Sequence, residues 1–240
     1  MSVLSANDLC KIYGQRKVVQ DIAVNVAQGE VVGLLGPNGA GKTTTFYMLA
    51  GIIKPNGGAV HLDDEAITML PLHERARLGM SYLPQESSIF KKLSVRQNLE
   101  IILEQSGLDS AEQKRRADQL LDELGITRLA DQKAMHLSGG ERRRLEIARA
   151  LILNPKFMLL DEPFAGIDPI AVDDIQGIVR GLKEKGIGVL ISDHNVRETL
   201  RICDRAYLVY EGRIILSGTP EEICADPKAR RVYLGEGFCL

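Results

Sequence analysis

The chain has 240 residues, 45% of them hydrophobic and 26% charged, which are the proportions of an ordinary globular protein. Its 30 basic and 32 acidic residues give a formal net charge of -2, so the charge balance does not indicate a nucleic-acid partner. The apolar runs are far shorter than the roughly 20 residues of a membrane-spanning helix, and the first residues carry no secretory pattern. We therefore expect a cytoplasmic protein.

Short runs rich in Val, Ile and Leu alternate with helical patterns along the chain, which is typical of an α/β fold with a mainly parallel sheet. Within the first third, a turn at residues 55–58 precedes a pattern that predicts a β-hairpin over residues 59–68, and hence a small antiparallel sheet beside the main one. From about residue 87 to residue 155 the strand signals vanish. Because residues 110–124 also show helical spacing, an inserted helical subdomain is expected there.

A phosphate-binding loop is the first motif with a chemical meaning. Residues 36–43 fit the pattern GxxxxGK[ST], between a predicted strand and a predicted helix. Backbone N–H groups of such a loop surround phosphates, Lys42 adds positive charge toward the β and γ phosphates, and the Thr43 hydroxyl can bind magnesium. The alternative is a plain glycine-rich turn, but the pattern arises by chance in roughly one chain in a hundred of this length. The candidate nucleotide-binding residues are Gly36, Pro37, Asn38, Gly39, Ala40, Gly41, Lys42, Thr43 and Thr44.

A second candidate for phosphate binding is the start of a predicted helix at Ser138, Gly139, Gly140 and Glu141. The serine and the glutamate satisfy a capping box, which is the structural explanation. Capping does not explain the two glycines, which weaken a first helical turn but let a phosphate approach its N–H groups. We expect the arginine triplet at residues 142–144 to be a solvated face. Another capping box, at residues 219–222, predicts a short helix near the end of the chain.

Two adjacent carboxylates, Asp161 and Glu162, follow the apolar run at residues 157–160. At the carboxyl end of a parallel strand such groups reach the ligand crevice of the sheet. Asp161 would hold the magnesium shell, while Glu162 would orient and deprotonate the water that attacks the γ-phosphate. By themselves they would more often be two surface acids at the start of a loop. The phosphate loop makes the catalytic interpretation the better one.

The phosphate loop, the helix start at Ser138 and the acidic strand end, in this order, resemble the ATPases of ABC transporters over nearly the whole chain. The resemblance implies an α/β P-loop NTPase with a RecA-like core, with ATP and Mg²⁺ as ligands. It places the core and the antiparallel β subdomain in residues 1–86 and 156–240, and the helical subdomain in residues 87–155. In that family the helix that begins at this serine, the signature helix, binds the ATP of the opposite subunit. The resemblance therefore also implies a homodimer.

Four further residues take their roles from the resemblance, which for Gln85 and His194 is supported by their positions after predicted strands. Tyr13 resembles the aromatic residue that stacks on adenine, and Gln85 resembles the glutamine that joins the magnesium site to the transmembrane partner. Asp168 matches a loop that crosses the dimer interface, although residues 165–168 read AGID where the family more often shows SALD. His194 resembles the switch histidine that senses the γ-phosphate. Alone, each of these residue types is more often structural or on the surface.

Within the family, the segments at residues 46–49, 83–90, 193–200 and 233–236 resemble the ATPases of bacterial lipopolysaccharide export. This implies two copies beneath a pair of inner-membrane subunits, with membrane contact only through those partners. Phe90 would fill a socket for a partner helix, or else pack in the core.

The nearest alternative is the ATPase of a branched-chain amino acid importer. The Phe90 segment and the end of the chain argue against this alternative. Outside transport, a chromosome-maintenance or DNA-repair ATPase would carry a long coiled coil, and no sustained heptads occur here. A ribosome-associated regulator of this type would carry two cassettes on one chain, whereas this chain has one.

Overall fold

The computed structural model describes all residues from 1 to 240, and its larger sheet has six strands in the order β10-β9-β3-β8-β7-β6. All neighbouring pairs are parallel except β9 with the edge strand β10, which confirms the mainly parallel sheet. Three inner strands are buried along their whole length, because elements cover both faces of the sheet. The bounds are β3 Val31–Leu35, β6 Met80–Leu83, β7 Phe157–Asp161, β8 Gly188–Ser192, β9 Arg205–Tyr210 and β10 Arg213–Gly218.

The smaller sheet is antiparallel throughout, with the strand order β2-β1-β4-β5. The predicted hairpin is β4 with β5, and it begins and ends two residues earlier than the predicted span. Two long N-terminal strands that the sequence did not reveal complete the sheet. In β2, Ile22, Val24 and Val26 are buried at every second position, as a strand with one covered face requires. The bounds are β1 Val3–Tyr13, β2 Arg16–Ala27, β4 Gly57–Leu62 and β5 Glu65–Ala66.

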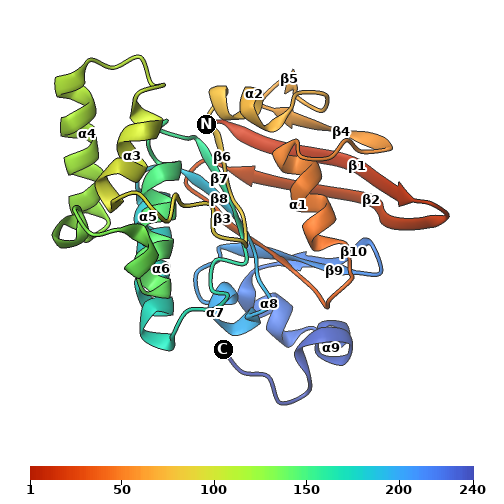
Figure 1. The fold of residues 1–240 in the computed structure, drawn as a ribbon. Coiled ribbons are helices and arrows are strands. Elements are labelled where there is room, and N and C mark those ends of the chain that lie inside the picture. The colour runs from red at the N-terminus through yellow and green to blue at the C-terminus, as the bar shows by residue number, and fades with distance from the viewer.

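The core also carries helices, of which α1 connects β3 with the smaller sheet and α6 and α7 lie beside the larger one (Figure 1). The predicted capping box at the start of α8 is confirmed, because the Thr219 hydroxyl accepts from the Glu222 N–H while the Glu222 carboxylate accepts from the Thr219 N–H. The bounds are α1 Lys42–Ala50, α2 Leu72–Arg77, α6 Pro169–Glu184, α7 Val196–Leu200, α8 Pro220–Ala225 and α9 Pro227–Ala229, followed by a π-helical turn Arg230–Leu234.

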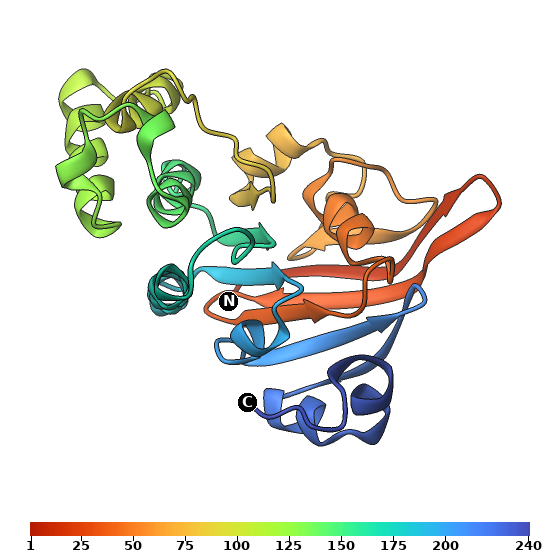
Figure 2. The same ribbon diagram turned by 60° about the horizontal axis from the view of Figure 1, so that its bottom comes forward.

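A lobe built of helices projects from one side of the sheets, where Figures 1 and 2 show it in yellow and green. Between residues 87 and 155 the only β pairing is an isolated bridge from Ser94 to Lys133. The helical character predicted for this stretch is therefore confirmed. The N-cap of α4 is Asp109, the residue directly before the span 110–124 in which helical spacing was predicted. The bounds are α3 Val95–Leu103, α4 Ser110–Glu123 and α5 Gly139–Ala150, with single 3₁₀ turns at Thr127–Leu129 and Ala134–His136.

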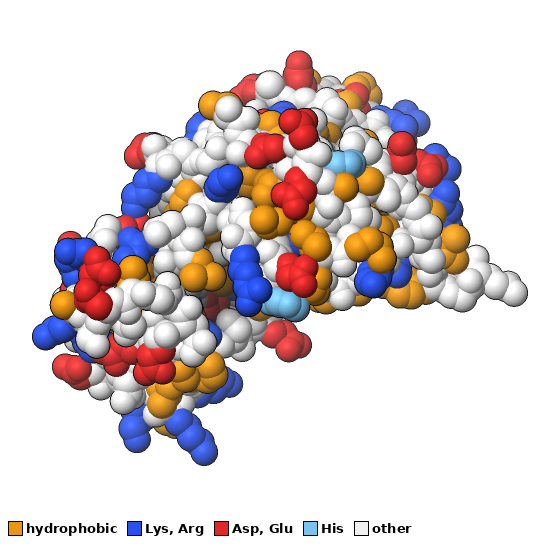
Figure 3. Space-filling view, turned by 90° about the horizontal axis from the view of Figure 1, so that it is seen from above, with side chains coloured by type: hydrophobic (Ala, Val, Ile, Leu, Met, Phe, Trp, Pro, Cys, Tyr) orange, Lys and Arg blue, Asp and Glu red, His pale blue; other side chains and the backbone are white.

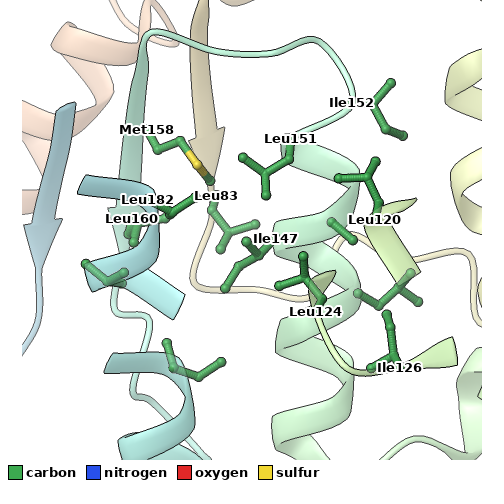
Figure 4. Packing of buried hydrophobic residues seen from close by; sticks show 14 of the residues in the cluster. Leu83, Leu120, Leu124, Ile126, Ile147, Leu151, Ile152, Met158, Leu160 and Leu182 are labelled. Carbon is green, nitrogen blue, oxygen red and sulfur yellow. The ribbon is translucent and has the colours of Figure 1, made fainter. Parts of the chain in front are cut away.

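The hydrophobic core runs on both sides of the larger sheet. On β3, Val31 packs into one cluster of buried side chains while Val32 and Leu34 pack into another, because successive residues of a strand point to opposite faces. The first cluster continues into the lobe, and Figure 4 shows Ile147 of α5 between Leu83, at the end of β6, and Leu124, which directly follows α4. The lobe is therefore attached to the sheet by shared apolar packing.

No helix in the structure combines the length and the apolar character needed to cross a bilayer.

Candidate active site

The phosphate loop lies where the sequence predicted it, between the end of β3 and the start of α1. Two of its glycines are required by crowding. A Cβ on Gly36 would approach the carbonyl oxygen of Val209 to 2.1 Å, and a Cβ on Gly41 would approach that of Val18 to 2.8 Å. Both glycines also have positive φ angles, 146° and 105°, which residues other than glycine rarely adopt. The turn between β9 and β10 supports the loop, since the Gly212 N–H donates to the carbonyl oxygen of Ala40.

The start of α1 differs from the other long helices in having no side-chain cap. A Ser or Asp side chain caps each of the others of comparable or greater length, α3, α4, α5 and α6. The first N–H groups of a helix need an acceptor, and an anion at that position supplies one together with a favourable interaction with the helix dipole. The uncapped start of α1 is therefore suited to a phosphate group.

Lys42 lies at this helix start, and only 8% of it is exposed. Its ammonium donates to the carbonyl oxygens of Gly36 at 2.6 Å and Pro37 at 3.1 Å. Burial lowers the pKa of Lys42, while the nearby carboxylates, Glu162 first, act in the opposite direction. A buried ammonium bonded only to neutral carbonyls gains a stronger partner when an anion enters the loop. The loop thus fits the phosphates of a nucleotide.

The two acids stand at the end of β7 in different surroundings. Asp161 is 3% exposed, and burial raises the pKa of its carboxyl to about 6. Glu162 has a φ of 46°, in the left-handed region, and its N–H donates to the carbonyl oxygen of Ser192 at 2.6 Å. A non-glycine residue in this region is strained, and such strain is concentrated at functional sites. The Glu162 side chain is 24% exposed, so it is more accessible to a ligand than the buried Asp161.

Two side chains from the ends of other strands meet at Glu162. The Gln85 side chain, two residues after β6, donates from Nε2 to Glu162 Oε2 at 2.7 Å. From the end of β8, His194 places Nδ1 at 3.4 Å from the same oxygen. Parallel strands deliver their carboxyl ends to one edge of a sheet, which is why residues far apart in sequence meet there. The structure therefore brings together the predicted base, the predicted glutamine and the predicted histidine.

The second predicted phosphate site is the capped start of α5. The Ser138 hydroxyl accepts from the Glu141 N–H, and the Glu141 carboxylate accepts from the Ser138 N–H. Gly140 is also needed for packing, because a Cβ there would approach the Ala171 Cβ to 2.7 Å. The glycines of this helix start are therefore explained in part by contacts within the chain, which the sequence did not indicate.

The two candidate phosphate sites line different pockets. Residues 37–40 border a pocket of about 570 Å³ together with Arg16, Lys17 and the turn after β9. Ser138, Gly140 and Glu141 border one of about 180 Å³, which Asp168 also lines. A single chain thus presents the two sites on separate surfaces.

The remaining predicted residues are exposed or serve as caps. Tyr13, at the end of β1, is 50% exposed, and the Lys11 ammonium lies 5.4 Å from its ring centroid. Asp168 is the N-cap of α6, where its carboxylate accepts from the Ala171 N–H. Phe90 is 44% exposed, so it is not a core residue.

Comparison with known families decides what kind of site this is. A family model described as ABC transporter matches residues 19–165, which include the phosphate loop, Gln85, the start of α5 and both acids. The chain belongs to the ABC transporter ATPase family. It binds ATP and hydrolyses it to drive transport, as this family does. The predicted α/β P-loop NTPase fold is confirmed with it.

Similar ABC ATPases cover the chain almost completely. The protein named lipopolysaccharide export system ATP-binding protein LptB from Escherichia coli (strain K12) is 57% identical over 241 residues, covering 100% of both chains. Proteins of the same name from Haemophilus influenzae and Acidithiobacillus ferridurans are 54% and 56% identical, covering 100% and 98% of each chain. The solved structure of MJ1267, an ATP-binding cassette of an ABC transporter in its ADP conformation, has a TM-score of 0.88 at 31% identity, covering 98% of this chain and 100% of the other.

One inference drawn from the C-terminal residues of this ABC ATPase has to be corrected. A second family model, described as branched-chain amino acid ATP-binding cassette transporter, matches residues 213–239. The expectation that the chain end argues against that branch of the family was therefore wrong. These residues form β10 and the helices after it, where Tyr233 and Phe238 pack on the cluster that contains Leu35.

The expectation of a solvated arginine face after the signature motif of the ABC ATPase was wrong for Arg143. Its side chain is 6% exposed and pairs with Glu146 at 3.0 Å, one turn further along α5. It also donates to the carbonyl oxygens of Pro84 and Asp161. The (i, i+3) pairing of an arginine with a glutamate on the buried face of a helix was the signal available in the sequence.

Arg75 is a second buried arginine that sequence reasoning missed. It has no acidic partner, and donates instead to the carbonyl oxygens of Leu70, Met48, Leu49 and Thr68. Burial lowers the pKa of its guanidinium to about 10. Since Met48 and Leu49 belong to the last turn of α1, Arg75 holds the far end of the helix that begins at the phosphate loop. No motif in the sequence indicates this role.

Proposed function

We propose that this chain is the ATPase subunit that drives extraction of lipopolysaccharide from the bacterial inner membrane and its export to the outer membrane. One observation carries the proposal: identity of 54%, 56% and 57%, over nearly the full length of both chains, to proteins named lipopolysaccharide export system ATP-binding protein.

In the proposed reaction the phosphates of ATP bind at the uncapped start of α1. Lys42 exchanges its two carbonyl partners for phosphate oxygens, which form shorter and stronger hydrogen bonds with an ammonium. Glu162 orients the attacking water and accepts its proton. Gln85 and His194, both close to the same Glu162 oxygen, keep that carboxylate in place. Phosphoryl transfer relies on such positioning and on charge stabilisation more than on covalent chemistry.

The residues for magnesium fit the ion by their chemistry. The Thr43 hydroxyl, the Gln85 side-chain oxygen and the Asp161 carboxylate are oxygen donors of the kind that Mg²⁺ prefers. No lysine or arginine pairs with the buried Asp161 carboxylate, so a cation there would balance a charge that the protein leaves uncompensated. We assign these three residues to Mg²⁺, which neutralises charge on the phosphates when bound.

The active form in this proposal is a homodimer. Ser138, Gly139, Gly140 and Glu141 lie at a helix start that lines a different pocket from the phosphate loop. They are therefore available to the ATP held by a second copy, and Asp168, which lines the same pocket, would lie at that interface. Tyr13, half exposed at the end of β1, would stack on adenine.

The dimer would work beneath a pair of inner-membrane subunits of the LptF and LptG kind, as a peripheral protein of the cytoplasmic face. Phe90 suits such a contact. Asn98 holds its backbone through two hydrogen bonds, the Arg149 guanidinium lies 4.9 Å from its ring centroid, and the ring stays half exposed. Figure 3 shows apolar side chains among charges of both signs on the face seen from above, and a hollow beside the lobe.

The proposed base and the dimer are tested together by the variant Glu162→Gln. With ATP and Mg²⁺ it should bind ATP, lose hydrolysis by at least about a hundredfold and elute as a dimer in size-exclusion chromatography with light scattering. Glu86→Gln, which neutralises an exposed neighbour of Gln85, should hydrolyse ATP normally. A hydrolysing Glu162→Gln protein would contradict the base assignment, and an ATP-bound monomer would contradict dimer formation without membrane subunits.

The ATPase of a branched-chain amino acid importer is the second candidate, because residues 213–239 match the model of that name. Purification of the tagged protein from its own membranes, followed by identification of the co-purifying integral subunits, separates the two. Recovery of amino acid permease subunits would overturn the lipopolysaccharide proposal and leave the ATPase assignment intact.

A further inference from the structure

Strand β6 supplies one hydrogen-bond donor to each of the two acids at the end of β7. Gln85 donates to Glu162, as described above, and the Tyr82 hydroxyl donates to Asp161 Oδ2 at 3.3 Å. The register explains the second contact. Tyr82 lies opposite Leu159 in the parallel pair, so its side chain is on the same face as Leu159 and, two residues further on, Asp161.

The Tyr82 ring also packs against Tyr47. The two ring centroids are 6.3 Å apart and the rings are nearly perpendicular, at 89°, an arrangement that aromatic pairs favour. Tyr47 belongs to α1, the helix that begins with Lys42 in the phosphate loop. The tyrosine pair thus connects the phosphate-binding helix with the end of β7.

Tyr82 is the one side chain that donates a hydrogen bond to the Asp161 carboxylate. Arg143 reaches only the backbone carbonyl of Asp161. Burial and the Asp161 charge raise the pKa of the Tyr82 hydroxyl far above its usual range, so the hydroxyl remains a donor. A buried carboxylate held through one oxygen has lost freedom of rotation, and its other oxygen stays free for a cation.

We propose that Tyr82 is a positioning residue for magnesium: through its hydroxyl it orders the Asp161 carboxylate that shares in binding the ion of Mg·ATP. The inference rests on the proposed assignment of Asp161 to Mg²⁺. Groups that hold a metal ligand in place typically change metal affinity or activity by about 10–100-fold when they are removed.

The test is Tyr82→Phe in the full-length protein, because phenylalanine keeps the ring that packs on Tyr47 and removes only the hydroxyl. The Mg²⁺ concentration for half-maximal ATP hydrolysis should rise about tenfold, while the rate at saturating Mg²⁺ stays within about twofold of that of the unaltered protein. Binding of a fluorescent ATP analogue should weaken with Mg²⁺ present and be unchanged in EDTA, which gives a readout independent of activity.

The matched control is Tyr47→Phe, which removes a neighbouring hydroxyl that has no hydrogen bond to Asp161 and should leave the Mg²⁺ dependence unchanged. An unaltered Mg²⁺ requirement in Tyr82→Phe would overturn the inference. Equal weakening of nucleotide binding with Mg²⁺ and in EDTA would also overturn it, because a general structural role has that effect. Absence of Mg²⁺-dependent hydrolysis in the unaltered protein would instead contradict the proposed function.

Discussion

Asp161 carries a charge that no basic side chain of the protein neutralises by pairing with it. Burial is the first cause of its pKa of about 6, and the neighbouring carboxylates of Glu162 and Asp193 add to it, against the Tyr82 hydrogen bond. The pKa in the folded state is higher than the ordinary value of 3.8, so the folded protein holds the proton more tightly than the unfolded chain. Protonation therefore stabilises the fold at low pH. That stabilisation is lost as the pH rises from about 4 to about 6.

It follows that Asp161→Asn should stabilise the nucleotide-free protein at neutral pH. The expected gain in the free energy of unfolding at pH 7 is about 1–3 kcal/mol, since one pKa unit corresponds to about 1.4 kcal/mol. No gain is expected near pH 4, where the native carboxyl is protonated. Urea unfolding at both pH values measures the effect. The exposed Asp131→Asn serves as the control, and an equal gain at both pH values would contradict the explanation.

At the residue scale, sequence reasoning found the groups that belong to recognisable motifs. Lys42 and the acids are marked by spacing and by their place after apolar strands, and the structure brings Gln85 and His194 to Glu162. Tyr82 and Arg143 were missed because neither belongs to a motif. Their partners are distant in sequence, and only the sheet register and the packing of α5 bring them near Asp161.

At the element scale, two helices with the same kind of N-cap allow the structural role of the capping serine to be distinguished from a functional role. α3 and α5 both begin with a complete capping box, formed by Ser94 with Gln97 and by Ser138 with Glu141. Both serines do the same structural work, but only Ser138 stands at a proposed ATP contact. The two helices are therefore a matched pair.

We expect Ser94→Ala and Ser138→Ala each to lower the free energy of unfolding by about 1 kcal/mol, the usual cost of losing an N-cap. Only Ser138→Ala should also reduce ATP hydrolysis, by about tenfold. Chemical denaturation and a steady-state ATPase assay of both variants provide the measurement. If both proteins lost stability and both kept full activity, Ser138 would be a cap and nothing more.

Elements with sharp local signals were predicted well, and those defined by pairing were not. The capping boxes of α5 and α8 and the buried strands around the phosphate loop follow from local sequence. The long strands β1 and β2 were missed. The register between them contains irregularities, and β1 also pairs with β4, more than 40 residues away. A strand of this kind is stabilised by its neighbours more than by its own residue preferences.

At the scale of the whole molecule, the helical lobe carries the proposed contact with the membrane subunits at Phe90 as well as the start of α5. Phe90, in the segment that leads from Gln85 to α3, is held by Asn98 and remains half exposed. Apolar side chains at such positions serve as anchors in protein interfaces.

Phe90→Ala should therefore leave ATP hydrolysis by the isolated protein within about twofold of the unaltered rate, because it removes no group of the site. Assembly with the membrane subunits should weaken by about tenfold or more, as loss of an interface anchor costs about 2 kcal/mol. Co-purification from membranes and transport assays measure this. Ile101→Ala, a similarly exposed apolar residue on α3, is the control. Normal assembly and transport with Phe90→Ala would exclude the anchor role.

The sequence by itself determined the kind of chemistry and the family, because phosphate loops, caps and acidic strand ends are local patterns with fixed spacing. Only the tertiary structure decided which groups meet. The parallel sheet brings Gln85, Glu162 and His194 to one edge, while the register of β6 with β7 places the Tyr82 hydroxyl on Asp161. The physical reason is that these contacts join residues separated by 32 to 79 positions in the sequence. Only folding brings such residues close together.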